Sequence, residues 1–231
     1  MIYFIHIPKT AGTSLLHCFL QLGEGAVLWH APTIEFGSSL PKAPCDILAS
    51  DSVRSHFKIY GGHFGLSEIL PYVTEEDLIV SVVREPIVRA FSLYNHIQVN
   101  DPSHPLHGVI KDRSIMEATQ VNAEFASQVS DMQCWQVSGH KDFRKAKAVI
   151  TKNLVKVYSI DEVQSLVTEV ARYLGASDMP IVPTLNESKD CDYLAKLGES
   201  EVRFIESLNA EDLKFHHFMK SRAKDVVRAT A

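Results

Sequence analysis

Apolar runs alternate along the chain with segments of helical periodicity. Mostly apolar runs at residues 2–7, 78–83 and 155–160 are typical of strands buried on both faces of a parallel sheet. Apolar residues at helical spacing follow the first two runs directly and the third after a short link. Because buried strands alternate with helices, the pattern predicts an α/β fold of three layers, with a mainly parallel sheet between two layers of helices. Ligands should then bind beyond the carboxyl ends of the strands.

The expected helices begin and end at recognisable residues. Pro86 suits the first turn of a helix that runs to about Ile97. Ser159 and Glu162 form a capping box before a helix that ends at Gly175. Further helices are predicted at residues 122–138 and 142–152, and a packing pair of helices is predicted from residue 200 onwards. Irregular connections are predicted at residues 31–56 and 100–113. A chain of 231 residues can bury one sizeable core, so a single domain over 1–231 is expected.

The loop between the first strand and its helix has the composition of a phosphate site. Unpaired N–H groups and the helix dipole favour an anion where a strand ends and a helix begins. Gly12 allows close approach of the backbone, Thr13 and Ser14 offer hydroxyl groups, and Lys9 adds a positive charge. The order is not that of a Walker A loop, because the lysine precedes the glycine.

Two further segments place polar side chains at strand ends. Arg84 follows the second buried run, and Ser92 lies between one and two turns into the next helix, so both can converge on one anion. His63 follows a short strand that ends in glycines, within residues 57–65. A neutral imidazole, whose ordinary pKa is about 6.5, can take a hydroxyl proton at physiological pH.

These three motifs together resemble sulfotransferases that use 3′-phosphoadenosine 5′-phosphosulfate (PAPS), in particular the branch containing heparan sulfate 2-O-sulfotransferase. The first loop is similar to the 5′-phosphosulfate loop of that family, and the matching residues are Lys9, Thr10, Ala11, Gly12, Thr13 and Ser14. Arg84 and Ser92 resemble the 3′-phosphate motif, and the segment from Tyr60 to His63 resembles the one that carries the catalytic base. The resemblance implies a P-loop-like sulfotransferase fold.

The resemblance also implies a reaction, in which a sulfuryl group passes from PAPS to an acceptor hydroxyl and adenosine 3′,5′-bisphosphate (PAP) is released. It implies that His63 takes the acceptor proton and that Lys9 stabilises the leaving phosphate oxygen. A late polar loop resembles the family's nucleotide-covering loop and adds weaker candidates, Asn186, Ser188 and Lys189. No metal is expected, because the sequence has no ligand cluster and the family reaction does not demand one.

The acceptor is less well defined than the donor. The family likeness favours a saccharide, while a lipid, a small metabolite or a peptide hydroxyl remains an alternative. Two other functions also stay open: an ATP-dependent phosphotransferase on a related P-loop scaffold, and a non-catalytic nucleotide- or glycan-binding module. The order of the first loop and the Arg84 and Ser92 pair argue against the first, and the presence of both Lys9 and His63 argues against the second.

Composition and charge bear on the class of partner and on the cellular compartment. A net charge of −5 and a pI near 6.1 argue against a nucleic-acid partner, although a local basic groove is compatible with them. The four cysteines include no C-x-x-C pair, so they are expected to be reduced thiols rather than zinc ligands. No apolar run approaches the ~20 residues that cross a bilayer, and no signal peptide is visible. A cytoplasmic, bacterial form of the family is therefore expected, although a chain trimmed to begin at Met1 would look the same. The sequence contains no signal for oligomeric state.

Overall fold

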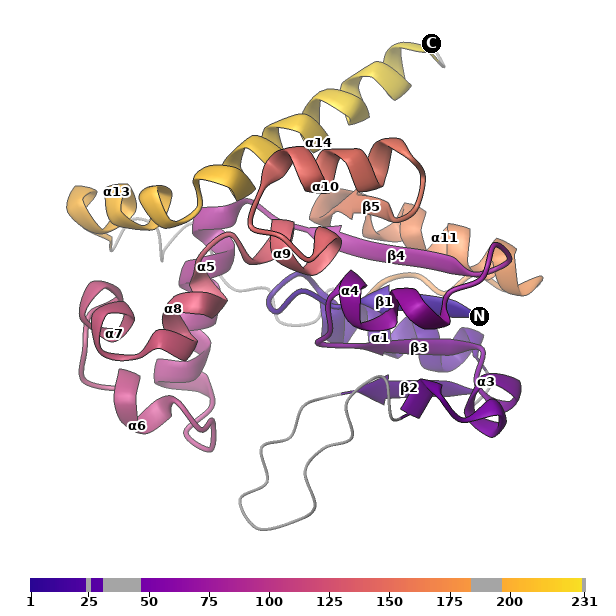
Figure 1. Cartoon of the computed structure of the whole chain (residues 1–231), viewed down its shortest axis with the longest axis horizontal. Helices are drawn as coiled ribbons and strands as arrows, with labels where there is room; N and C mark the ends of the chain where they lie inside the picture. Colours follow the sequence, from indigo (N-terminus) through magenta and orange to yellow (C-terminus); the bar gives the residue numbers. More distant parts are fainter. Residues whose placement is uncertain (24–25, 31–46, 184–196, 230–231) are drawn as a thin grey trace.

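Five parallel strands form a central sheet in the computed structural model, which describes residues 1–23, 26–30, 47–183 and 197–229 (Figure 1). Their order across the sheet is β2-β3-β1-β4-β5, and every neighbouring pair is parallel. The strands are β1 (Ile2–Ile5), β2 (Val27–His30), β3 (Ile59–Gly62), β4 (Leu78–Val83) and β5 (Lys156–Ser159). Parallel strands bring their carboxyl ends to one edge of the sheet, so the segments after β1, β3 and β4 lie next to one another there.

Helices cover both faces of the sheet, as the alternation of β1 side chains requires. Tyr3 and Ile5 enter a core with α4 (Leu66–Ile69), α9 (Met132–Ser138), α10 (Phe143–Thr151) and α14 (Ala210–Ala229). Ile2 and Phe4 enter a second core on the opposite face, with α1 (Gly12–Leu22) and α11 (Val163–Leu174). All four β1 residues are fully buried. The predicted three-layer α/β fold is thus confirmed.

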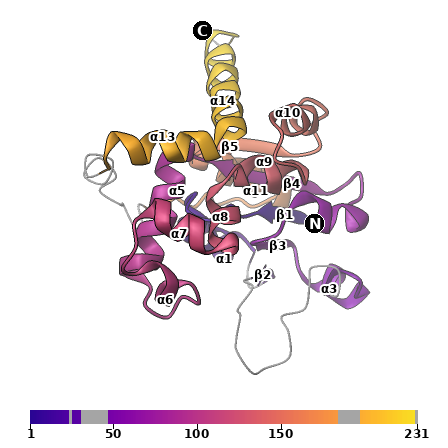
Figure 2. The ribbon, with the colours of Figure 1, turned by 60° about the vertical axis from the view of Figure 1, so that its left-hand side comes forward.

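A helical lobe with its own apolar core lies beyond the end of β4. It consists of α5 (Pro86–Asn95), the π-helical turn η2 (His96–Asn100), α6 (His107–Ile110), α7 (Ile115–Val121), α8 (Ala123–Val129) and α13 (Glu199–Leu208). Figures 1 and 2 show this lobe beside the sheet and α14 extending past the rest of the described chain. The remaining elements are α3 (Asp51–His56), η1 (Leu70–Tyr72) and η3 (Ile160–Glu162).

Local sequence signals set several element ends as expected. Pro86 is the first residue of α5, where the Glu85 carboxylate accepts a hydrogen bond from the Val88 N–H at 2.7 Å. Gly175 ends α11 in the left-handed conformation, with φ of 68°. The Ser159 and Glu162 capping box is present, although it begins the short η3 turn before α11.

Three expectations about elements were wrong. Residues 122–138 form two helices rather than one, because Asp131 adopts a left-handed conformation with φ of 42° between α8 and α9. Among the described residues of the supposed irregular segments, 51–56 form α3 and 107–110 form α6. Strand β2 was not anticipated at all, since four residues carry too little periodicity to reveal an edge strand. In the described part of the chain, no helix is long and apolar enough to cross a membrane.

Candidate nucleotide and catalytic site

The loop between β1 and α1 has an unusual backbone. Lys9 and Ala11 both have positive φ angles, 71° and 66°, which residues other than glycine rarely adopt. The Thr10 side chain between them is fully buried, and its hydroxyl donates to the Ile7 carbonyl oxygen at 2.8 Å. Successive N–H groups in such alternating conformations form concavities that bind anions. The Thr10 hydroxyl is thus engaged within the loop, which leaves the Thr10 main chain as its means of contacting a ligand.

Helix α1 begins directly after this loop at Gly12. Ala11 at its N-cap has no side-chain hydrogen bond, so no side chain of the cap residue satisfies the first N–H groups of the helix. Thr13 is exposed and Ser14 is largely buried. The first turn of an eleven-residue helix therefore adjoins the loop with its positive dipole end.

Gly12 is required by the imidazole of His6. A Cβ atom at Gly12 would lie 1.8 Å from His6 Nε2, closer than any real contact. The His6 ring cannot move aside easily, because it lies against three other rings, those of Phe4, Trp29 and His63, with centroid separations of 5.7, 5.3 and 4.4 Å. The glycine thus serves an internal contact, a reason that differs from the close approach to a ligand that the sequence suggested.

Replacing Gly12 by alanine should therefore destabilise the protein through steric overlap alone. The residue is helical, so alanine itself suits the backbone, and we expect a loss of about 1–3 kcal/mol in the free energy of unfolding, the usual cost of overpacking. The measurement is denaturant unfolding of Gly12→Ala with and without His6→Ala. Overlap with the ring predicts that Gly12→Ala costs much less in the His6→Ala background. Equal costs in the two backgrounds would show that His6 is not the obstacle.

His63 lies at the carboxyl end of β3, beside His6 at the end of β1. Its Nδ1 lies 3.2 Å from the His6 carbonyl oxygen. A carbonyl oxygen only accepts hydrogen bonds, so Nδ1 carries the proton in this contact and Nε2 is the nitrogen that can accept one. Burial lowers the pKa of His6 well below its ordinary value, and the charges of His63 and Lys9 lower it further. His6 is therefore neutral and serves as an uncharged ring beside His63.

Arg84 and Lys9 bring two cations together at this edge. Arg84 Nη1 donates to the Lys9 carbonyl oxygen at 3.2 Å, which ties the segment after β4 to the loop after β1. Burial, followed by the charge of Arg84, lowers the pKa of Lys9. The Lys9 charge also lowers the pKa of His96, the first residue of η2, although burial of that imidazole has the larger effect. Such a half-buried pair of cations favours an anionic ligand.

The remaining predicted residues are Ser92 and three residues of the late loop. Ser92 lies partly buried in the second turn of α5, and no contact among the described residues joins it to Arg84. Convergence of these two side chains on one anion therefore stays a prediction. Asn186, Ser188 and Lys189 lie outside the described residues.

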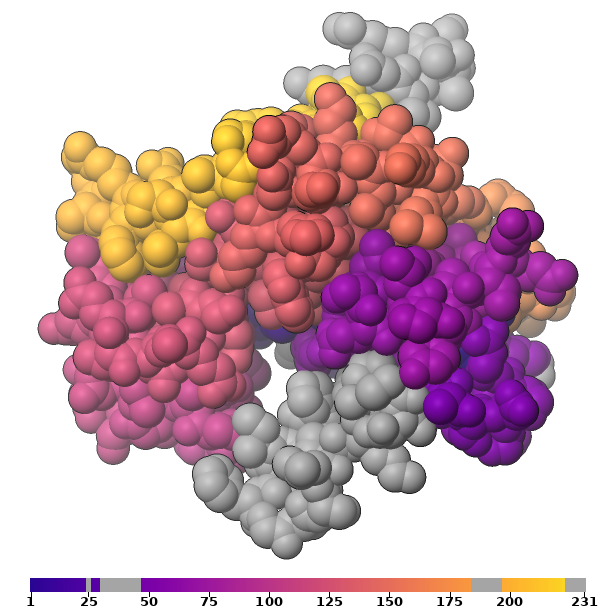
Figure 3. Space-filling view, viewed as in Figure 1, coloured from indigo at the N-terminus to yellow at the C-terminus, as the bar shows by residue number. Residues whose placement is uncertain are grey.

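Sequence reasoning missed three buried side chains at this edge, those of His6, Gln133 and Gln136. His6 carried a faint signal, since it is a polar residue at the end of an otherwise apolar strand. The two glutamines lie one turn apart on α9, far along the chain from the loops they contact, and no local pattern marks them. In the space-filling view, a hollow separates the helical lobe from the segment around α4, and indigo N-terminal residues line its floor (Figure 3).

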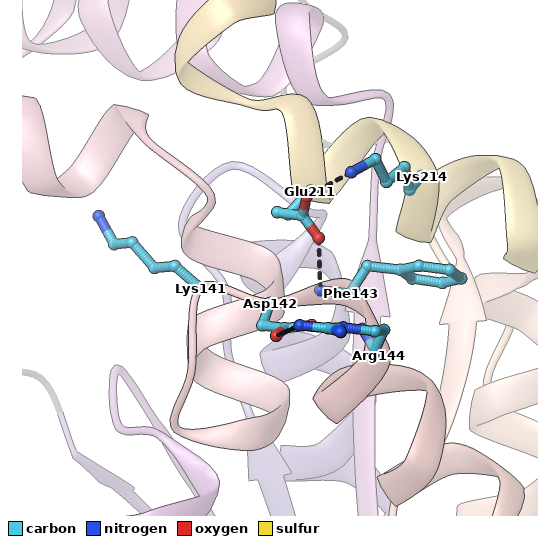
Figure 4. Close-up of a pocket in the computed structure, with 6 residues that line it drawn as sticks. All are labelled: Lys141, Asp142, Phe143, Arg144, Glu211 and Lys214. Atoms are coloured by element: carbon cyan, nitrogen blue, oxygen red, sulfur yellow. Dashed lines mark hydrogen bonds and ion pairs between the residues drawn. The ribbon is translucent and has the colours of Figure 1, made fainter.

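A separate pocket lies between the start of α10 and the start of α14 (Figure 4). Its carboxylates are engaged: Glu211 accepts from the Phe143 N–H at 2.9 Å and pairs with Lys214, and Asp142 pairs with Arg144 at 3.0 Å. Its lining residues are Lys141, Asp142, Phe143, Arg144, Glu211 and Lys214, and none of them is a predicted site residue. Within the described residues, no group of histidine, cysteine or acidic side chains is arranged to hold a metal ion.

Comparison with known proteins bears on the fold. No protein-family model matches the chain, and no curated protein sequence matches it. The chain is similar to the crystal structure of mouse sulfotransferase SULT7A1 complexed with PAP, with a TM-score of 0.53 and 13% identity over 96% of this chain and 88% of that one. For a sulfotransferase from Alicyclobacillus acidocaldarius the TM-score is 0.45, with 18% identity over 90% and 95% of the two chains. The parallel sheet, its two layers of helices and the first of these likenesses show that the chain has the P-loop-like α/β fold of a sulfotransferase.

Proposed function

We propose that this protein transfers a sulfuryl group from PAPS to an acceptor hydroxyl. One observation carries the proposal: the segments after three adjacent parallel strands bring a positively charged phosphate loop, an arginine and a histidine to one edge of the sheet. Lys9 follows β1, Arg84 follows β4 and His63 follows β3, and direct contacts join Arg84 to Lys9 and His63 to His6. Groups suited to binding phosphate and a group suited to accepting a proton thus lie next to one another.

In the proposed reaction each residue has a distinct task. His63 Nε2 takes the proton of the acceptor hydroxyl while its oxygen bonds to sulfur, and the bond from sulfur to the 5′-phosphate oxygen breaks. Lys9 meets the negative charge that develops on that leaving oxygen. The N–H groups from Lys9 to Ser14 hold the 5′-phosphate, and Arg84 with Ser92 holds the 3′-phosphate. The products are PAP and the sulfated acceptor, and the proton remains on His63 until solvent removes it.

We further propose a saccharide as the acceptor. The support is the likeness of the segment from Tyr60 to His63 to that of heparan sulfate 2-O-sulfotransferase. Figure 3 shows a hollow between the helical lobe and the segment around α4, with N-terminal residues on its floor, where we propose that an acceptor binds. Incubating the protein with labelled PAPS and panels of saccharides, lipids and small hydroxyl compounds tests this part, because label transfer to another class would correct the acceptor without changing the donor.

The donor is tested by thermal unfolding in the presence of nucleotides. PAP should raise the Tm much more than ADP or AMP at equal concentration, because only PAP offers a 3′-phosphate to Arg84. A charge-assisted contact of this kind is worth about 1.5–3 kcal/mol, which corresponds to roughly tenfold or more in Kd. In an Arg84→Ala variant the advantage of PAP over ADP should largely disappear.

The two competing functions predict different results in the unfolding and label-transfer measurements. Equal stabilisation by ADP and PAP would favour an ATP-dependent phosphotransferase and contradict the assignment of PAPS. Strong binding of PAP without label transfer to any acceptor would favour a non-catalytic binding module. An Arg84→Ala variant that unfolds more easily yet still prefers PAP would show that Arg84 is structural.

A further inference from the structure

We propose that Gln133 and Gln136, two buried glutamines one turn apart on α9, are separate positioning residues for the two halves of this site. Gln133 would hold the arginine that binds the donor, and Gln136 would hold the histidine that accepts the proton. The inference rests on the proposed function, and it assigns to α9 a role that neither its sequence nor its exposure suggests. Both side chains are almost completely inaccessible to solvent, with exposed fractions of 0% and 1%.

Gln133 forms a two-point contact with the main chain of Arg84. The Arg84 N–H donates to Gln133 Oε1 at 2.8 Å, and Gln133 Nε2 donates to the Arg84 carbonyl oxygen at 3.0 Å. Both peptide groups that flank the Arg84 Cα are therefore fixed at the point where β4 ends. The direction in which the guanidinium leaves the sheet depends on these two peptide groups, so the amide of Gln133 sets where the arginine can reach.

Gln136 does the same for the segment that carries His63. Its Nε2 donates to the His6 carbonyl oxygen at 3.1 Å and to the Phe64 carbonyl oxygen at 3.2 Å. The His6 oxygen is also the acceptor for His63 Nδ1. One carboxamide thus fixes the residue after His63 and the oxygen that selects the tautomer of His63. This double link holds the ends of β1 and β3 at a constant separation around the imidazole.

Helix α9 is itself anchored well enough to serve as a fixed support. Asp212 of α14 accepts hydrogen bonds from the first N–H groups of α9, those of Gln133 at 2.9 Å and Cys134 at 2.7 Å. In return, Asp131 Oδ1 accepts from the N–H groups of Glu211 and Asp212, at 3.0 and 2.9 Å. The starts of the two helices therefore cap one another, which fixes α9 relative to the core on this face of the sheet.

The contacts of the two glutamines favour a positioning role over simple packing in the core. Burying an amide is costly unless its polar atoms are paired, and an apolar side chain of similar length would fill the same space. Gln136 Oε1 is buried and has no hydrogen-bond partner in the described part of the chain, so this residue retains an unsatisfied acceptor while its nitrogen serves two carbonyls. Among the described residues, the side-chain hydrogen bonds of the pair go to Arg84, His6 and Phe64, which lie in the segments that carry the proposed binding and proton-accepting groups.

The test compares Gln133→Met with Gln136→Met in the full chain, because methionine keeps the length and removes the hydrogen bonds. PAP affinity is measured by calorimetry, and turnover is measured at saturating PAPS with the acceptor found in the screen. Gln136→Met should lower turnover about tenfold to 100-fold and leave the Kd for PAP within about twofold, since small displacements of a reacting group are expensive. Gln133→Met should weaken PAP binding about tenfold and affect turnover at saturation much less.

Ser138→Ala is the matched control on the same helix. It removes a hydroxyl that bonds to the carbonyl oxygens of Cys134 and His140, and it should change neither quantity. If a methionine variant does not fold, Gln136→Asn and Gln133→Asn retain the amide but withdraw it by one methylene, and the same split is expected. Equal changes in turnover and PAP affinity in both variants, or lowered Tm with neither changed, would overturn the assignment. Failure of the wild-type protein to bind PAP would instead count against the proposed function.

Discussion

Replacing His63 by alanine should lower the turnover number of sulfuryl transfer by about 10²–10⁴, the usual contribution of a positioned proton acceptor, while the Kd for PAP stays within a few fold. The reason is the fixed tautomer. His63 donates from Nδ1 to the His6 carbonyl oxygen, so Nε2 is the nitrogen that can accept a proton. Removing the imidazole deletes the proton acceptor but not the loop or the arginine that hold the nucleotide.

A His63→Gln variant separates chemistry from packing. Glutamine can still donate a hydrogen bond towards the His6 carbonyl, yet it cannot take up a proton, so its turnover should be as low as that of His63→Ala. His140→Ala, which changes an exposed histidine far along the chain, is the control and should retain normal turnover. Near-normal turnover in both His63 variants would assign the proton to another group, and His96, whose pKa responds to the Lys9 charge, would be tested next.

The sequence predicted those helices and strands whose signals come from residues that are neighbours in the chain. β4 was predicted because all six of its residues are buried, and five of the six are apolar, as a strand covered on both faces requires. α11 was predicted because one face packs on the core and Gly175 ends it. β2 and the break at Asp131 were missed for the opposite reason. An edge strand of four residues and a single left-handed residue depend on partners distant in the sequence.

The same distinction applies to the site. Arg84 and His63 were singled out because each directly follows a strand, and Lys9 because it lies in the loop between β1 and α1; the topology then brings those strand ends together. The contact between Gly12 and the His6 ring could not be inferred, because it joins the start of α1 to a side chain at the end of β1. Gln133 and Gln136 were also out of reach, since their partners lie 49 to 130 residues away.

Lys9→Met should reduce turnover by about 10²–10³, the range measured when one preorganised donor to a developing negative charge is removed. Methionine retains most of the length of lysine and loses only the charge. The variant should also bind PAP more weakly, because the Lys9 ammonium adds to the positive potential around the phosphate loop. Lys9→Arg keeps the charge and is the matched comparison, with turnover between that of the wild type and Lys9→Met. Unchanged turnover in Lys9→Met would remove Lys9 from the chemistry.

The pH dependence of kcat/KM for PAPS provides an independent test of the Lys9 charge, because this ratio reports ionisation of the free enzyme. Burial and the charge of Arg84 lower the pKa of Lys9 below its ordinary value of 10.5, and among the described residues the Lys9 charge in turn lowers the pKa of His6 and of His96. A lowered pKa means that the ammonium loses its proton at a lower pH than a free lysine does. On the alkaline side kcat/KM should therefore fall, with a midpoint below 10.5. In Lys9→Arg the guanidinium stays charged to a pH above about 12, so the fall should move to higher pH. An alkaline fall at the same pH in both proteins would identify another group as its source and would contradict an essential positive charge at Lys9.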